Sequence, residues 1–285
     1  HSGVRPVMTG SARSPDVPLL IVGAGRVGLS LVAAARQAGV PAEVVGPGSR
    51  RRTVTVRGRR LAVHAAGIRL ACHQPVHLVL AVPDDSLSAA ASDWAEQLPA
   101  DCTGIALHTS GVHAAGMLEP LQRRGWPTAS WHPLQTFPKP DPTRFSGIVV
   151  GVEGDPAAVR AGSRLARRLG ARPIHLPAAL KALYHCLATI SCSHVAAQML
   201  FCHAALGEFP PAVRKPLARG LRALSAATVA GFSDENPAAG VTGPAARGDR
   251  LTVKRHLTEL RERFPEWVTV YQLLDDFLRR QTRRD

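Results

Sequence analysis

The chain has 285 residues, 45% of them hydrophobic, which is enough for two domains or one large one. Its formal net charge is +14, but the excess arginine is scattered and no aromatic residues interleave with it, which argues against a nucleic-acid-binding surface. No apolar run approaches the ~18 uninterrupted residues of a membrane-spanning helix, so we expect no membrane partner. Residues 1–18 lack the apolar core of a signal peptide and predict a mobile tail of a cytoplasmic protein.

The first folded segment predicts a strand, a helix and a second strand. "PLLIVGAGRVGLSLVAAARQAGVPAEVVG" has a buried apolar run at Leu19 to Val22, an amphipathic stretch that ends at Gly39 and another apolar run at Ala42 to Val45. The turn between the first strand and the helix reads GxGxxG, in the context that a dinucleotide-binding fingerprint requires.

Each glycine of this turn has a mechanical task. The first allows the tight turn, the second lets the backbone approach a pyrophosphate, and the third lets the helix pack closely on the strand. Unpaired N–H groups at the helix N-terminus would bind the anion. The alternative is a purely structural turn. The predicted pyrophosphate-binding residues are Gly23, Gly25, Arg26, Val27 and Gly28.

The end of the second strand distinguishes between the two nicotinamide cofactors. An NAD-preferring site usually has an acidic residue there to bind the ribose, whereas this chain reads "GPGSRRR". Arginine pairs with phosphate through two parallel hydrogen bonds, so the segment favours the 2′-phosphate of NADP, bound by Ser49, Arg50 and Arg51. The alternative is that these arginines form only a solvated loop.

The strand and helix alternation continues to residue 176. Further strands are predicted in "VHLVLAVPDD", "GIALHTSG", "PTASWHPLQTF", "FSGIVVGVEG" and "RPIHL", and a helix capped by Asp155 in "DPAAVRAGSRLARRLG". The fold class is therefore α/β, with a Rossmann doubly wound sheet over residues 19–176. Ligands of such sheets bind outside the strand C-termini, so Val82, Pro83 and the segment His108 to Gly111 should face the cofactor.

From residue 177 onward the apolar period changes to 3.6, which predicts an all-helical domain over residues 177–285. A helix of some thirty residues would extend about 45 Å, longer than a small domain needs for its own core, so we expect a homodimer. The predicted helices are Pro177 to Gly207, Pro211 to Gly231, Arg250 to Arg263 and Glu266 to Arg280.

Together these motifs resemble a known family. The segments "GAGRVG", "AVPDD", "HTSG", "HPLQTF", "KALYH" and "TGPAARGD" are similar to those of Rossmann-like oxidoreductases that carry a functionally uncharacterised helical C-terminal domain. That family is related in layout to ketopantoate reductases, β-hydroxyacid dehydrogenases and pyrroline-5-carboxylate reductases. In the first two, a lysine and an asparagine four residues later address the reacting oxygen. The resemblance implies that Lys181 matches this lysine and that His185 stands at the asparagine.

The chemistry of these two residues suits a reductase. Hydride addition leaves negative charge on oxygen, and a cation that can donate a proton lowers that barrier. Lys181, His185 and Thr189 share one helix face, and an apolar helix lowers the pKa of its lysine towards the useful range. The alternative is a lysine that extends to solvent beside a core histidine. Where the family usually has another asparagine, this chain has Ser193.

Four other residues are weaker candidates. Ser110 could bind a substrate carboxylate or the cofactor amide, or only cap its loop, and His132 could orient substrate or only brace its loop. Thr242 and Arg247 precede a helix that Asp249 should cap, and Arg247 could clamp a carboxylate. No histidine pattern is typical of a metal site, so we expect no metal.

The sequence therefore predicts an NADPH-dependent reductase of a small carboxylate-bearing carbonyl compound, such as the 2-oxo acid ketopantoate. Lys181 would donate the proton, His185 would orient it and Arg247 would hold the anion. Two alternatives stay open: an imine reductase that resembles pyrroline-5-carboxylate reductase, and a module that senses NADPH without turnover.

Overall fold

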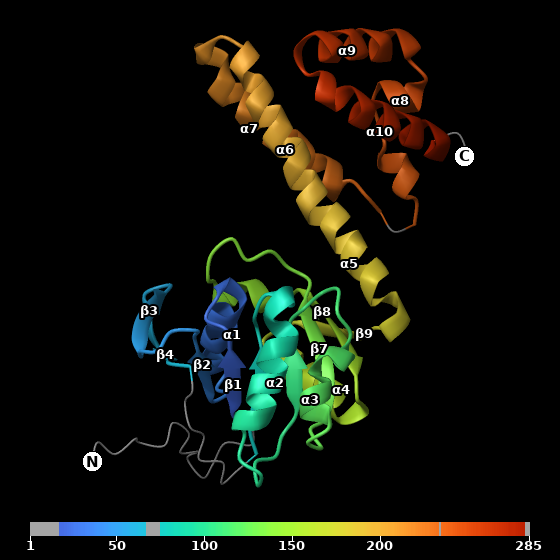
Figure 1. Ribbon diagram of the computed structural model, residues 1–285. Coiled ribbons are helices and arrows are strands. Elements are labelled where there is room, and N and C mark those ends of the chain that lie inside the picture. The colour runs from blue at the N-terminus through green and yellow to red at the C-terminus, as the bar shows by residue number, and fades with distance from the viewer. Residues whose placement is uncertain (1–16, 67–74, 234, 283–285) are drawn as a thin grey trace. The chain divides into compact units, whose positions relative to one another are not determined.

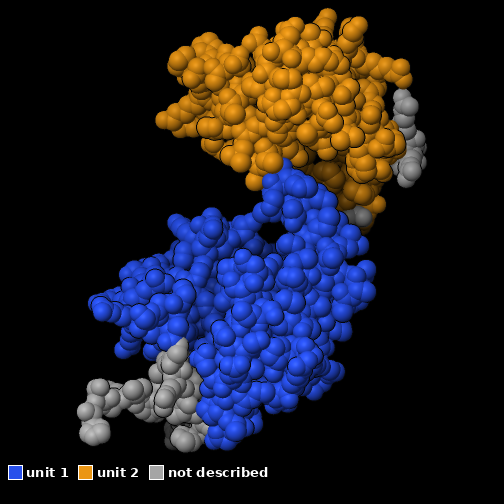
Figure 2. Space-filling model, in the orientation of Figure 1, with its two compact units in different colours: residues 1–194 blue, residues 195–285 orange. Residues whose placement is uncertain are grey.

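The computed structural model describes residues 17–66, 75–233 and 235–282 and divides the chain into two compact units, residues 1–194 and 195–285 (Figures 1 and 2). The predicted tail falls mostly outside the described residues. Sequence periodicity placed the domain boundary after residue 176, whereas the compact units divide after His194. The difference arises because the first helix beyond the sheet, α5 (Lys181–Thr189), buries its first side chain against the sheet domain.

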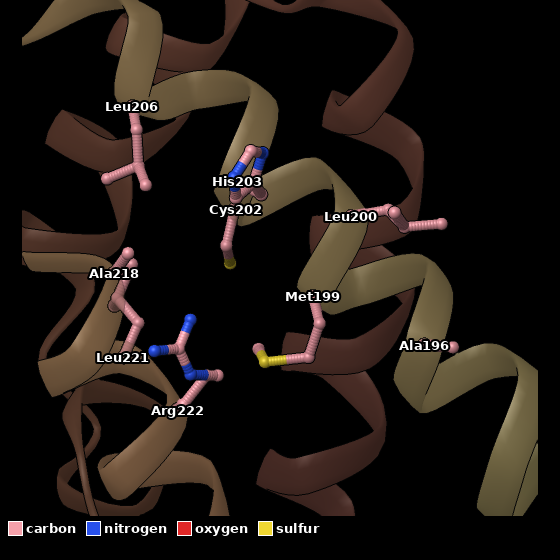
Figure 3. A pocket seen from close by; sticks show the side chains of 9 residues that line it. All are labelled: Ala196, Met199, Leu200, Cys202, His203, Leu206, Ala218, Leu221 and Arg222. Atoms are coloured by element: carbon pink, nitrogen blue, oxygen red, sulfur yellow. The ribbon is translucent and has the colours of Figure 1, made fainter. Parts of the chain in front are cut away.

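The second unit is helical, as predicted. Phe201 stacks on Trp267 with ring centroids 4.1 Å apart, and Phe264 meets Phe201 edge-on at 5.4 Å. Between the first two helices, Met199, Cys202, Leu206 and Leu221 line an apolar groove of about 400 Å³ (Figure 3). The elements of this unit are α6 (Val195–Ala205), η6 (Leu206–Glu208), α7 (Pro211–Ala230), η7 (Pro237–Gly240), α8 (Pro244–Arg247), α9 (Arg250–Arg263), η8 (Pro265–Trp267) and α10 (Val268–Gln281).

One helical stretch stands out for its exposed apolar surface. Within the described residues, Ala178–Glu208 is long and apolar enough by length and composition to cross a membrane, and none of its apolar window is buried. The sequence contains no unbroken apolar run of membrane-spanning length, because serines and histidines separate the apolar residues of this stretch. The absence of a membrane-spanning segment therefore stays a prediction.

In the first unit, the described residues form one nine-stranded sheet in the order β3-β4-β2-β1-β5-β6-β7-β8-β9. The hairpin β3/β4 and the pair β7/β8 are antiparallel, and the remaining pairs are parallel. The chain order reverses between β1 and β5, which is where an open sheet of this kind binds its ligand. The strands are β1 (Leu19–Val22), β2 (Ala42–Val45), β3 (Arg52–Val56), β4 (Arg59–His64), β5 (His77–Leu80), β6 (Ala106–His108), β7 (Thr128–Pro133), β8 (Val149–Gly154) and β9 (Arg172–His175).

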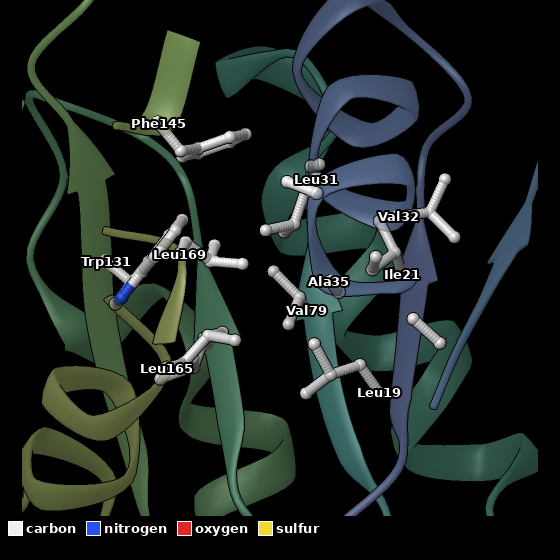
Figure 4. Packing of buried hydrophobic residues seen from close by; sticks show 14 of the residues in the cluster. Leu19, Ile21, Leu31, Val32, Ala35, Val79, Trp131, Phe145, Leu165 and Leu169 are labelled. Atoms are coloured by element: carbon white, nitrogen blue, oxygen red, sulfur yellow. The ribbon is translucent and has the colours of Figure 1, made fainter. Parts of the chain in front are cut away.

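Both faces of the sheet are covered, as expected for a doubly wound fold. Alternate residues of β1 belong to different cores: Leu19 and Ile21 pack on one face, Leu20 and Val22 on the other. Figure 4 shows the first of these cores. The remaining helical elements of this unit are α1 (Arg26–Gln37), η1 (Asp84–Ser86), α2 (Leu87–Gln97), η2 (Ala115–Leu118), α3 (Glu119–Gln122), η3 (Pro142–Phe145), α4 (Pro156–Arg168), η4 (Ala178–Leu180) and the π-helix η5 (Ile190–His194).

Two predicted helix caps have different outcomes. Asp249 caps α9, because its carboxylate accepts the backbone N–H of Thr252 at 3.0 Å. Asp155 is the N-cap residue of α4, as predicted, but its side chain makes no capping hydrogen bond and instead accepts the backbone N–H of Thr128 at 2.7 Å. Asp155 therefore attaches the start of α4 to β7.

Candidate active site

The glycine turn after β1 has the shape of a pyrophosphate cradle. Gly23 adopts φ +110°, and a Cβ on Gly23 or Gly28 would overlap a backbone carbonyl oxygen, so neither position accepts a side chain. At Gly25, by contrast, a Cβ would meet nothing within 4 Å. The space beside Gly25 is the space that a dinucleotide backbone needs, and the glycines therefore fit NAD(P).

The N-terminus of α1 completes this cradle. Gly25 is its N-cap residue in extended conformation, and no side chain caps the helix. The backbone N–H groups of Arg26 and Val27 therefore lie at an uncapped helix end, which attracts anions. The predicted contribution of Arg26 and Val27 to anion binding would come from these main-chain groups.

A pocket of about 500 Å³ lies at the C-terminal ends of β1, β2 and β5. Gly23 and Gly25 line it together with Val82 and Pro83, whereas the segment His108 to Gly111, which was also expected to face the cofactor, does not line it. Its far wall comes from α2, with Asp93, Trp94 and Gln97.

One arginine of the segment GPGSRRR faces this pocket. Arg52, the first residue of β3, lines the pocket, and its Nη2 lies 3.7 Å from the place that a Cβ on Gly46 would take. Ser49, Arg50 and Arg51 are exposed and do not line it. Pairing with Val63 of β4 sets the direction of Arg52, and the sequence by itself does not predict that pairing.

A second group of polar side chains gathers where β6, β7, β8 and α5 meet, and we call it the polar cluster. Ser130 and His132 lie two residues apart on β7 and so share one face of the sheet. Glu153 of β8 pairs with Ser130 in the ladder, and Gly151 pairs with His132. The members of the polar cluster are Ser110, Ser130, His132, Glu153, Lys181, Tyr184 and His185.

Lys181 is the buried centre of the cluster, with only 2% of its surface exposed. Its Nζ donates to Ser130 Oγ at 2.7 Å and to the carbonyl oxygen of Ser110 at 3.3 Å. Burial lowers the pKa of Lys181 to about 8, while the negative charges of Glu153 and Asp84 act in the opposite direction. The alternative in which this lysine extends to solvent is therefore wrong.

His132 is a half-buried member of the cluster. Its Nδ1 is 3.0 Å from the hydroxyl of Tyr184, and its ring meets the ring of His185 at 5.9 Å in an edge-on arrangement. Burial, followed by the charges of Lys181 and His185, lowers the pKa of His132 to about 4. Gly111 makes this approach possible, because a Cβ there would overlap the ring of His185 and come within 2.9 Å of His132 Nε2.

Ser110 stabilises its own loop and contacts Lys181 through its carbonyl oxygen. Its hydroxyl accepts the backbone N–H of His113 at 3.2 Å, which is the loop-capping alternative, and its carbonyl accepts from Lys181. Its own backbone N–H donates to Nδ1 of His108 at 3.2 Å. Nε2 of His108, 3.1 Å from the carbonyl of Ala114, therefore carries the proton of that ring.

Among the remaining predicted residues, His185 joins the cluster through the edge-on contact of its ring with that of His132. His185 shares a helix face with Lys181, but among the described residues the two share no hydrogen-bond partner, and Thr189 makes no hydrogen bond to the cluster. Thr242 and Arg247 are exposed residues of the second unit. The positions of the two units relative to one another are not determined, so their roles toward substrate stay predictions.

Sequence reasoning missed three members of the cluster. Ser130 stands two residues before His132, so strand alternation could have identified it. Tyr184 stands three residues after Lys181, on the same side of the helix. Glu153 carried no local signal, because only the antiparallel pairing of β8 with β7 brings it to Ser130.

Comparisons with known proteins agree with this architecture. Residues 4–133 match the model of a Rossmann-like domain, and residues 148–276 match that of a domain of unknown function, DUF2520. A search of curated proteins finds no significant match.

Three solved structures of similar fold are distant from this chain in sequence. A Bacteroides fragilis protein assigned as an NADP oxidoreductase is 17% identical with TM-score 0.67, covering 93% of this chain and 98% of its own. Plasmodium falciparum pyrroline carboxylate reductase with NADP bound is 13% identical with TM-score 0.56, covering 94% and 100%. A Myxococcus stipitatus imine reductase variant in complex with NAD+ is 14% identical with TM-score 0.53, covering 90% and 93%. At these identities the likeness shows the fold.

Proposed function

Because the chain joins a Rossmann-like domain to a DUF2520 domain, we propose that it is an NADPH-dependent reductase of a small carbonyl or imine compound that bears a carboxylate. The observation that carries the proposal is the polar cluster: a buried lysine of lowered pKa stands at the C-terminal edge of a sheet whose glycine turn fits a dinucleotide. A 2-oxo acid such as ketopantoate is the first choice of substrate.

Different residues of the first unit would hold the pyrophosphate, the nicotinamide half and the 2′-phosphate of the cofactor. The uncapped α1 N-terminus and Gly25 would bind the pyrophosphate, and Val82 and Pro83 would contact the nicotinamide half. Arg52 would pair with the 2′-phosphate, and no carboxylate among the described residues forms an ion pair with it. The choice of NADP over NAD rests on this arginine and on the lack of an acid after β2.

When bound, NADPH supplies a hydride, with its electron pair, to the carbonyl or imine carbon. The π electron pair then moves to oxygen or nitrogen, and that atom takes a proton from the ammonium group of Lys181, which becomes a neutral amine and regains a proton from solvent. Ser130 and the Ser110 carbonyl occupy two of the three N–H groups of Lys181 and so direct the third. Glu153 and Asp84 keep the lysine from losing its proton too readily.

The test is NADPH consumption, with NADH in parallel, against ketopantoate, other small 2-oxo acids and cyclic imines. We expect turnover on one of these classes and faster consumption of NADPH than of NADH. Turnover on imines alone would select the imine reductase alternative. Tight NADPH binding without turnover on any compound would contradict the reductase and favour the sensing module.

We also propose that the exposed helical stretch Ala178–Glu208 packs against a second copy of the chain. From Ala182 to Gly207 the sequence has no Asp, Glu, Lys or Arg, although the chain carries a net charge of +14. Two such helices can pair without repulsion between like charges, and depletion of charge is typical of the centre of a protein interface. Leu200, 71% exposed, lies within this stretch.

Analytical ultracentrifugation without detergent tests this proposal. The wild type should sediment as a dimer and Leu200→Glu as a monomer, because the glutamates would be buried without partners. Leu251→Glu is the control, since Leu251 is similarly exposed but lies on α9. A monomeric wild type would contradict the dimer, and co-flotation of that monomer with lipid vesicles would assign the helix to a membrane.

A further inference from the structure

The hydrogen bond between Tyr184 and His132 is built by three elements of the first unit. Tyr184 comes from α5 and His132 from β7, and their rings meet edge-on with centroids 5.5 Å apart. The hydroxyl of Tyr184 lies over β8 at Gly151, where a Cβ would come within 3.0 Å of it. A glycine directly opposite His132 in the ladder thus leaves room for the phenol.

This hydrogen bond determines which nitrogen of His132 carries the proton. A phenol is a good donor, and among the described residues Nδ1 of His132 is the partner of the Tyr184 hydroxyl. If the hydroxyl donates, Nδ1 accepts and the ring proton must be on Nε2. The donor side of the imidazole then faces away from Tyr184, toward Gly111 and His185.

The nitrogen on that side is open. Nε2 of His132 has no hydrogen-bond partner among the described residues, and in the same part of the chain only Nδ1 of His77 is both sealed from solvent and unpartnered. Nε2 is therefore not sealed from solvent, whereas Lys181 is buried. This nitrogen is free to donate a hydrogen bond to a ligand.

The charge state of His132 suits a hydrogen-bond donor. Burial and the charges of Lys181 and His185 hold its pKa near 4, so the ring is neutral at physiological pH. The pKa of Tyr184, raised to about 12 by burial, keeps the phenol protonated as well. A neutral imidazole can polarise a carbonyl without giving up its proton.

We propose that Tyr184 is a positioning residue that holds His132 as the Nε2–H tautomer, and that this N–H donates a hydrogen bond to the oxygen or nitrogen that becomes negative during reduction. The inference rests on the proposed function and adds a second donor beside Lys181. Preorganised donors of this kind stabilise a developing negative charge.

The tautomer is tested first, without substrate or cofactor, by ¹⁵N NMR of the imidazole rings in the full chain near pH 7. We expect His132 as Nε2–H in the wild type and a detectable fraction of Nδ1–H in Tyr184→Phe, because the donor to Nδ1 is lost. His108 is the internal control: its tautomer is held by Ser110 and Ala114 and should not change. An Nδ1–H ring in the wild type would overturn the inference, and that measurement needs no variant.

Turnover is the second readout. Tyr184→Phe should lower kcat about tenfold on the substrate found for the wild type, with the KM for NADPH unchanged. Tyr271→Phe is the matched control, because Tyr271 makes the same bond to Nδ1 of His256, at 2.7 Å, in the second unit, and its loss should leave kcat unchanged. An unaltered kcat in Tyr184→Phe would overturn the inference. A wild type without turnover would instead contradict the proposed reductase activity. The NMR measurement would then still show which nitrogen of His132 carries the proton.

Discussion

Lys181→Met should lower turnover by roughly 10²–10⁴-fold, the usual contribution of a general acid, while NADPH binding stays unchanged. Methionine has nearly the length of lysine and fills the same buried space, so the change removes the proton donor and leaves little cavity. The melting temperature should stay within a few degrees of the wild type, because a buried ammonium group contributes little net stability. Steady-state kinetics and thermal unfolding measure the two effects separately.

The pH dependence gives a second check on Lys181. The pKa of about 8 predicts that wild-type turnover is high below this pH and falls as the pH rises through it, since only the ammonium form donates. The free energy of unfolding should change in the opposite direction and rise with pH. Between about pH 8 and 10.5 the unfolded chain binds more protons at this position than the folded one, so the wild type should gain stability relative to Lys181→Met as the pH rises.

Lys139→Met is the matched control, since Lys139 is an exposed lysine of the same unit. It should change neither turnover nor the pH profile. If Lys181→Met keeps its activity but unfolds at a much lower temperature, the lysine is structural and the proposed acid is wrong.

Arg52→Ala should weaken NADPH binding by about 10–100-fold, the equivalent of a lost hydrogen-bonded pair with a charged group. NADH binding should hardly change, because NADH lacks the 2′-phosphate that Arg52 is proposed to bind. Arg52 is exposed at the pocket rim, so its removal should leave the fold intact. Fluorescence titration with both cofactors measures the selectivity.

Arg51→Ala provides the comparison for this prediction. Arg51 is the neighbouring arginine, is equally exposed and does not line the pocket. It should bind both cofactors like the wild type. Equal losses in the two variants would indicate a general effect of the basic loop, and an unchanged ratio of NADPH to NADH affinity in Arg52→Ala would contradict the assignment of the 2′-phosphate.

Asp84 connects the two parts of the first-unit site. It follows Val82 and Pro83 of the predicted cofactor pocket, and its negative charge partly offsets the lowering of the pKa of Lys181 and of His132 by burial. The cofactor pocket and the polar cluster are therefore close enough to influence each other electrostatically. A hydride donor and a proton donor have to meet in this way at one substrate carbon and its heteroatom.

Local patterns in the sequence predicted most of the fold. Apolar runs, the GxGxxG turn and the change of period near residue 177 depend on neighbours along the chain, and the Rossmann-like sheet, the helical region that follows it and the glycine turn were predicted from them. The spacing of Lys181 and His185 likewise placed both residues on one helix, and their catalytic roles stay predictions.

Only the tertiary structure decided which side chains meet. Ladder pairing turned Arg52 rather than Arg51 to the pocket and brought Glu153 to Ser130, while packing of α5 on the sheet buried Lys181 and placed Tyr184 on His132. These contacts join residues that lie from about ten to more than fifty positions apart, and they depend on strand register and helix docking, which no local pattern encodes. The sequence by itself thus determined a two-domain chain with a dinucleotide turn and a lysine-bearing helix, and three-dimensional packing determined the cluster in which that lysine lies.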